Sequence, residues 1–241
     1  MTQKKTLSIH IQLADGRQVG AGIHEQNGCV VAVDEKISLM VLTRSSVENE
    51  QPIALTAAEI LIDDMQTNLS PGKNATAECL RESIDNIHEY LYEQQRECVV
   101  SREAAATAMA VVQYWNGRIF CMVTREFDCL LLQAGELVKL VSKNVSSGLP
   151  GENATFDTSI QDHDVLPGDV VLMARSTDIK TIGQDFVRMT LSRFSDNLDV
   201  ALRQINQKAS RKGLEFPPVL ILTRIEKNPT PPSWVDKLRK S

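Results

Sequence analysis

The chain has 241 residues, of which 42% are hydrophobic and 24% are charged, as in ordinary globular proteins. Its 26 Lys and Arg residues against 31 Asp and Glu residues give a net charge of −5, which argues against a general affinity for nucleic acid, because phosphate backbones are bound through clustered basic residues. No apolar run approaches the roughly 20 residues that span a bilayer, and the first residues lack the apolar stretch of a signal peptide. We therefore expect a cytoplasmic protein with neither a membrane nor a nucleic acid as partner.

The N-terminal part of the chain predicts strands followed by a pair of helices. Apolar and polar residues alternate over 7–13, which indicates a half-buried strand. Two short apolar runs at 29–33 and 37–42 indicate a hairpin of buried strands. Apolar residues at helical spacing then predict helices over 52–66 and 75–97.

The centre of the chain predicts four consecutive strands. They cover 107–113, 118–124, 127–133 and 136–142. Tight turns at Asn116-Gly117 and Ala134-Gly135 join neighbouring strands, so we interpret the four as one antiparallel meander. The polar segment 143–164 that follows predicts an irregular loop.

The C-terminal part predicts a strand at 170–174, helices near 183–194 and 196–212, and a last strand at 219–225 on the edge of a sheet. This order of elements favours an α+β fold, a four-layer αββα sandwich in which a helix pair covers the outer face of each of two antiparallel sheets.

The same sequence patterns predict the domain organisation. We expect a single domain over 1–227 and a Pro-rich basic tail over 228–241. Trp234 in this tail either docks onto a partner or folds back onto its own domain, and the sequence leaves both alternatives open.

The cysteines and histidines are dispersed and form no motif of a zinc site or a hydrolase triad. We expect the cysteines to act as small buried hydrophobic residues. They are Cys29, Cys79, Cys98, Cys121 and Cys129.

Three segments carry a resemblance to a known family. Residues 117–141 are similar to a family segment that runs strand, Gly-Asp-Ser-Arg, strand, Gly-Glu-Leu, strand, and residues 166–174 and 201–225 are similar to two later framework segments. Over roughly 6–227 the chain resembles the bacterial metal-dependent Ser/Thr protein phosphatases of type 2C (PPM). The resemblance implies their four-layer fold and an active site in which aspartates at strand ends bridge two divalent metal ions.

The resemblance also implies that this active site is degenerate. The positions that match the family's phosphate-binding arginine and its acidic motifs are Gly22, Asn27, Thr43, Glu126, Ser176 and Phe216. Only Glu126 keeps a carboxylate, and it does not match a central bridging position. Hard cations need anionic oxygen ligands, so the resemblance implies a pseudophosphatase with no catalytic residue and with its Mg²⁺ or Mn²⁺ site lost.

Three arginines lie at or beside these former metal-site positions. They are Arg44, Arg125 and Arg175. Guanidinium groups suit bidentate recognition of phosphate or carboxylate, so one hypothesis is a metal-free pocket for an anion or a phosphopeptide. The alternative is that the arginines pair with Glu25, Glu126 and Asp128, or point to solvent.

The leading hypothesis is therefore a catalytically inactive protein that acts by binding, as a regulator or scaffold in a bacterial Ser/Thr phosphorylation pathway. The resemblance implies a Ser/Thr kinase or a phosphoprotein as partner. One rival is a divergent active phosphatase with a site rebuilt from Glu25, Glu126, Asp128 and the three arginines. A second rival is an αββα hydrolase with an N-terminal nucleophile, for which Thr2 and Thr6 are the available residues.

Overall fold

The structure is a computed structural model in which the described residues are 10–13, 18–19, 21–26, 28–35, 37–45, 51–69, 77–97, 99–101, 105–141, 148–214 and 220–225. Asn27, Phe216 and the predicted tail 228–241 with Trp234 lie outside the described residues. The same holds for Thr2, Thr6 and Cys98.

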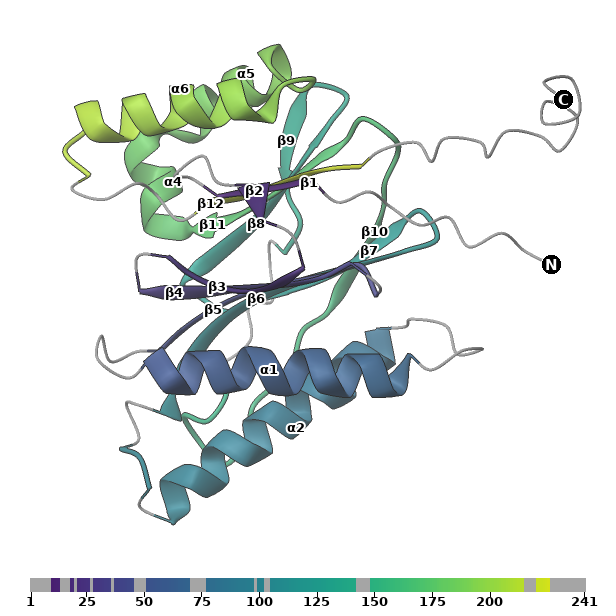
Figure 1. Ribbon diagram of the computed structural model, residues 1–241, viewed down its shortest axis with the longest axis vertical. Coiled ribbons are helices and arrows are strands. Elements are labelled where there is room, and N and C mark those ends of the chain that lie inside the picture. The colour runs from purple at the N-terminus through teal and green to yellow at the C-terminus, as the bar shows by residue number, and fades with distance from the viewer. Residues whose placement is uncertain are drawn as a thin grey trace, which may run out of the picture.

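Four layers stack in the order helices, sheet, sheet, helices (Figure 1). One outer layer consists of α1 (Gln51–Asn68) and α2 (Ala77–Arg96). The other consists of α4 (Ser176–Ile182), α5 (Gln184–Arg193) and α6 (Leu198–Arg211). The predicted αββα sandwich is confirmed.

The two sheets have six strands each and are antiparallel in every described pairing. Sheet A lies under α4–α6 and has the strand order β2-β1-β12-β11-β8-β9. Its strands are β1 (His10–Leu13), β2 (Gln18–Val19), β8 (Phe127–Gln133), β9 (Glu136–Lys139), β11 (Val170–Arg175) and β12 (Leu220–Arg224). Sheet B packs on α1 and α2 and has the strand order β10-β7-β6-β5-β4-β3. Its strands are β3 (Gly22–Gln26), β4 (Cys29–Asp34), β5 (Leu39–Ser45), β6 (Thr107–Trp115), β7 (Arg118–Val123) and β10 (Gln161–Asp164).

The predicted four-stranded meander is wrong, because the four central strands form two hairpins in different sheets. β6 pairs with β7 in sheet B, and β8 pairs with β9 in sheet A. Between them the chain crosses the sandwich in a turn closed by the Phe127 N–H, which donates to the Thr124 carbonyl at 3.1 Å. The Thr124 hydroxyl accepts the Met109 N–H at 2.9 Å and so ties the start of this turn to β6. The crossing turn therefore links the two sheets.

Two further sequence predictions need correction. The last strand is not an edge, because β12 lies between β1 and β11, where the N-terminal strand completes the sheet beyond it. The segment 143–164 is not wholly irregular, because residues 161–164 form β10 and extend sheet B by pairing with β7. Periodicity did not reveal β3 or the short helix α4 either.

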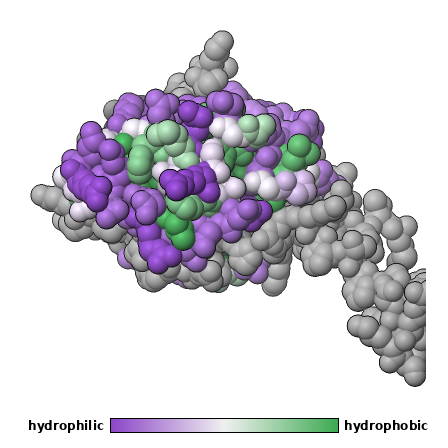
Figure 2. Space-filling model, turned by 90° about the horizontal axis from the view of Figure 1, so that it is seen from above, coloured by the Kyte–Doolittle hydropathy of each residue, from purple (hydrophilic) through white to green (hydrophobic). Residues whose placement is uncertain are grey.

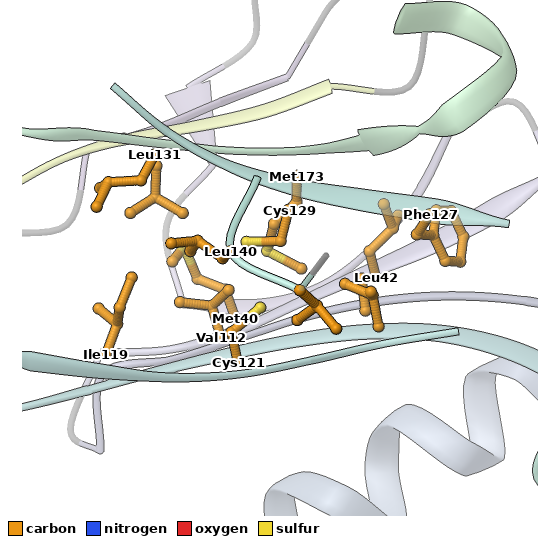
Figure 3. Close-up of a cluster of buried hydrophobic side chains, with 14 of the residues drawn as sticks. Met40, Leu42, Val112, Ile119, Cys121, Phe127, Cys129, Leu131, Leu140 and Met173 are labelled. Atoms are coloured by element: carbon orange, nitrogen blue, oxygen red, sulfur yellow. The ribbon is translucent and has the colours of Figure 1, made fainter. Parts of the chain in front are cut away.

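The space between the sheets is filled by apolar side chains (Figure 3). Sheet A contributes Phe127, Cys129, Leu131 and Met173, while sheet B contributes Met40, Leu42, Val112, Ile119 and Cys121. Side chains alternate between the faces of a strand, so the residues between these, such as Leu39 and Val41, point instead toward α1 and α2. A third apolar cluster joins sheet A to α4–α6.

The outer face of the α4–α6 layer is largely hydrophilic, with small apolar areas between the polar side chains (Figure 2). The helices of this layer bury one face each; in α6 the buried residues are Ala201, Leu202, Ile205 and Ala209. Among the described residues, none of the helices combines the length and the apolar character that crossing a membrane requires.

Gln113 on β6 is a buried polar residue in the layer between sheet B and the helices α1 and α2. Its side chain is fully buried, and neither amide atom has a hydrogen-bond partner within the described part of the chain. We expect Gln113→Leu to raise the free energy of unfolding by about 1–2 kcal/mol, because an unsatisfied buried amide costs free energy that an apolar side chain of similar size avoids.

Urea denaturation of the two proteins measures this effect. Gln133→Leu is the matched control, because the Gln133 amide donates to Asp169 Oδ2 at 2.8 Å and its loss is expected to destabilise the protein. A loss of stability in Gln113→Leu as large as that of the control would contradict the prediction.

Candidate functional site

β11 runs directly into α4 at one end of the sandwich (Figure 1), and two ion pairs lie at this end. Arg44 lies near the end of β5 and Arg175 ends β11, while Glu126 belongs to the crossing turn and Asp178 to α4. We call Arg44, Glu126, Arg175 and Asp178 the charged cluster.

The first pair joins sheet B to the crossing turn. Arg44 Nη1 lies 3.3 Å from Glu126 Oε2, and the two side chains are 29% and 32% exposed. Arg44 shares the inner face of β5 with Met40 and Leu42, because side chains two residues apart point to the same side. The Glu126 carbonyl accepts the Ser176 N–H at 2.9 Å, so the same residue also holds the junction of β11 and α4.

The second pair is more buried and has bidentate geometry. Arg175 Nε and Nη2 each donate to a different oxygen of Asp178, both at 3.0 Å. The Asp178 side chain is only 2% exposed and that of Arg175 is 23% exposed. A carboxylate removed from water to this degree is stable only when it is paired and hydrogen-bonded, and the guanidinium fork meets both needs.

Cys29, the first residue of β4, lies near both ion pairs. Burial raises the pKa of the Cys29 thiol to about 11, and the charges of Arg175 and Arg44 oppose this while those of Asp178 and Glu126 add to it. All four members of the charged cluster therefore act on one fully buried sulfur atom. The thiol stays protonated at neutral pH, so Cys29 is not a nucleophile in the folded protein.

We expect this thiol to make stability depend on alkaline pH. The folded-state pKa is raised above its ordinary value of 9.0, so the unfolded chain loses its proton first and stability falls as the pH rises from 9 toward 11. At pH 10.5 the loss attributable to Cys29 is about 2 kcal/mol.

Urea denaturation at pH 8 and pH 10.5 tests this, with Cys29→Ala as the reference. Between the two pH values, the unfolding free energy of the wild-type chain is expected to fall by about 2 kcal/mol more than that of Cys29→Ala. Equal drops in the two proteins would show that the buried thiol does not contribute.

Arg125 lies beside the charged cluster but is more exposed. Its side chain is 60% exposed, and its Nη2 lies 3.4 Å from Glu152 Oε1. Glu152 sits in a fixed turn, because its other carboxylate oxygen accepts the Leu149 N–H at 2.9 Å and the neighbouring Gly151 N–H donates to His88 Nδ1 at 3.1 Å.

The structure brings some of the predicted site residues together and separates others. Arg44, Glu126, Arg175 and Ser176 meet, and the predicted pairing of Arg44 with Glu126 is present. Thr43 points away from them: its hydroxyl donates to the Ala54 carbonyl of α1 at 2.8 Å.

Three other residues also lie apart from the charged cluster. Gly22 pairs with Val33, at the end of β4 opposite to Cys29. Glu25 is exposed on the edge strand β3, and Asp128 pairs with Lys139 of β9. The acidic residues that the rebuilt-phosphatase rival requires are therefore not assembled around Glu126.

Sequence reasoning missed Asp178, Cys29 and Glu152 as members or neighbours of this site. Asp178 carried a local signal, because an aspartate three residues after an arginine faces it when both lie at a helix start. Cys29 and Glu152 carried none, because their proximity to the arginines depends on how the sheets stack.

The described residues at this end do not form a donor set for a divalent cation. Mg²⁺ and Mn²⁺ take oxygen ligands, chiefly carboxylates, and both cluster carboxylates already face a guanidinium group. In the described part of the chain no three His, Cys, Asp or Glu side chains are grouped so that they could hold a metal ion.

Comparison with known proteins identifies the fold. No family model matches the sequence, and no curated protein matches it. The solved structure of PppA, described as a key regulatory component of T6SS in Pseudomonas aeruginosa, is similar with a TM-score of 0.69 at 14% identity, over 92% of this chain and 99% of that one. The Mycobacterium tuberculosis serine/threonine phosphatase PstP/Ppp gives 0.65 at 12% identity over 92% and 99%.

A further similar structure is the catalytic domain of the phosphatase PstP in complex with two manganese ions, with a TM-score of 0.66 at 9% identity over 92% of this chain and 99% of that chain. These matches span nearly the whole of each chain, at identities that establish architecture only. The chain therefore has the fold of the bacterial type 2C (PPM) Ser/Thr protein phosphatases.

Proposed function

We propose that the chain is a cytoplasmic binding protein with a type 2C phosphatase fold that does not hydrolyse phosphoesters through a two-metal centre. It acts as a regulator or scaffold in a bacterial Ser/Thr phosphorylation pathway, with a Ser/Thr kinase or a phosphoprotein as its partner. The observation that carries the proposal is the pairing of both cluster carboxylates, Glu126 and Asp178, with arginines of neighbouring strand ends.

The physical reason is charge. Two-metal hydrolysis needs an excess of carboxylate oxygens to hold the cations that activate water and stabilise the leaving group. Here two guanidinium groups balance two carboxylates, so the charged cluster has no net negative charge to attract a cation. The description of PppA as a regulatory component is consistent with a regulatory role for this fold.

A hydrolysis assay tests the proposal. Purified protein incubated with para-nitrophenyl phosphate and Mn²⁺ is expected to give no turnover above the buffer rate, while an active type 2C phosphatase assayed in parallel shows that the conditions support hydrolysis. Mn²⁺-dependent turnover that Glu126→Gln abolishes would overturn the proposal and favour the divergent phosphatase.

Binding of an anionic group at this end is the second part of the proposal. Arg125 supports it, because its guanidinium is the most exposed of the three arginines and its contact with Glu152 is long, so that an incoming phosphoryl group can replace the carboxylate at little cost. Arg44 lies on the inner side of the same end, paired with Glu126 at 3.3 Å.

Calorimetric titration with phosphoserine and inorganic phosphate tests this part. Arg125→Glu is expected to weaken binding at least tenfold. The matched control is Arg118→Glu, because Arg118 is also exposed and ion-paired but begins β7, at the opposite end of the strand from Arg125. Equal affinities of the wild type and Arg125→Glu, or an equal loss in both variants, would contradict a site at Arg125.

A further inference from the structure

The charged cluster has a second property, which concerns stability rather than ligand binding. Its members come from three places that the fold must hold together: β5 of sheet B, the turn that crosses between the sheets, and the junction of β11 with α4 in sheet A. Glu126 is central, because its carboxylate contacts Arg44 and its carbonyl accepts the Ser176 N–H. The cluster therefore links the two sheets at one end of the sandwich.

The two ion pairs are held at one junction. The Glu126 carbonyl accepts the Ser176 N–H at 2.9 Å, and Ser176 lies between Arg175 and Asp178 in the chain. The Asp178 carboxylate, 2% exposed, has Arg175 as a cationic partner at 3.0 Å on both oxygens. Without the arginines, the buried Asp178 carboxylate would lose its bidentate cationic partner and the partly exposed Glu126 carboxylate would lose its own, which is unfavourable.

We infer that Arg44 and Arg175 are built-in counter-ions that hold this end of the sandwich together without a divalent cation and prevent one from binding. This inference rests on the proposed function, since it explains why the fold persists without a two-metal centre. Its consequence is specific: a neutral side chain in place of each arginine removes the guanidinium partners of Glu126 and Asp178 and creates a site that attracts a divalent cation.

The test measures the midpoint of thermal unfolding (Tm) in 5 mM MnCl₂, in EDTA, and in NaCl of matched ionic strength. The Tm of the wild-type chain is expected to be the same in all three. The double variant Arg44→Met/Arg175→Met is expected to unfold at a lower temperature and to regain at least about 3 °C in Mn²⁺, because binding to the folded state alone stabilises it.

The charge-preserving double variant Arg44→Lys/Arg175→Lys is the matched control. It loses the guanidinium fork but keeps both positive charges, so its Tm is expected not to respond to Mn²⁺. Arg224→Met is a second control, because its partner Asp196 is 87% exposed and hydrated without it. If Arg44→Met/Arg175→Met does not fold, Arg44→Met alone replaces it, since it leaves the Arg175–Asp178 pair intact. In that case electron paramagnetic resonance counts the Mn²⁺ ions bound by the variant and by the wild-type chain.

The outcomes separate the inference from the proposed function. If Arg44→Met/Arg175→Met folds and its Tm rises no more in Mn²⁺ than that of Arg44→Lys/Arg175→Lys, the inference is overturned and the proposed function stands. A wild-type chain that is itself stabilised by Mn²⁺ overturns the inference, and Mn²⁺-dependent hydrolysis by that same chain overturns the proposed function as well.

Discussion

Replacing Gly151 with alanine is expected to lower the free energy of unfolding by roughly 3 kcal/mol or more, because strain and overpacking act together at this position. Gly151 has φ +78°, a left-handed conformation that side chains disfavour. A Cβ added there lies 2.5 Å from the Ala105 carbonyl oxygen and 2.7 Å from Leu91 Cβ. The first of these contacts is with backbone, which cannot move aside as the end of a flexible side chain can.

The surroundings of Gly151 increase the effect. The Thr107 N–H donates to the Pro150 carbonyl at 3.1 Å, and the Gly151 N–H donates to His88 Nδ1, so the turn is attached both to β6 and to α2. Displacing the turn breaks these bonds and moves Glu152 away from Arg125.

Gly135→Ala is the matched control for Gly151→Ala. Gly135 has a similar φ of +83°, but a Cβ there meets nothing within 4 Å. The control is expected to lose only the conformational strain, about 1 kcal/mol. Urea denaturation followed by circular dichroism measures both variants, and similar losses would contradict the close packing around Gly151.

Replacing Asp178 with alanine is expected to lower the free energy of unfolding by about 3–5 kcal/mol, because it leaves the half-buried Arg175 guanidinium without its carboxylate. Asp196→Ala is the control: Asp196 forms an ion pair with Arg224 at 2.7 Å but is 87% exposed, so its loss is expected to change stability by less than about 1 kcal/mol.

A double-mutant cycle distinguishes the pair from the individual side chains. In Arg175→Met/Asp178→Leu both charges are removed together, so no uncompensated charge remains and much of the stability is expected to return. Chemical denaturation of Arg175→Met, Asp178→Leu and the double variant gives the coupling energy. Additive losses would show that Arg175 and Asp178 do not stabilise the fold as a pair.

Local sequence patterns were sufficient for most of the helices and strands. The helices α1 and α2 follow from apolar residues at helical spacing, and the β4–β5 hairpin follows from two apolar runs around a short polar break. The framework segments 117–141 and 166–174 also carried the resemblance that led to the four-layer fold. Such patterns depend on residues close together in the chain, which is why one sequence reveals them.

Those patterns did not reveal which strands pair with each other. β7 and β8 are separated by only a three-residue turn and lie in different sheets, whereas β1 and β12, from opposite ends of the chain, are neighbours. A strand that is apolar on both faces can pair equally well in either sheet, so its place is decided by how the layers pack and not by its own residues.

The same division holds for the candidate site. The sequence by itself determined that arginines stand at three strand ends or turns and that few carboxylates accompany them. Only the tertiary structure decided that Arg44 rather than Thr43 faces the interior, that Arg175 pairs with Asp178 and Arg125 with Glu152, and that Cys29 lies among the charges. The reason is that a side chain's face is set by strand register and its partner by the stacking of the sheets, and both bring together residues that are far apart in the chain.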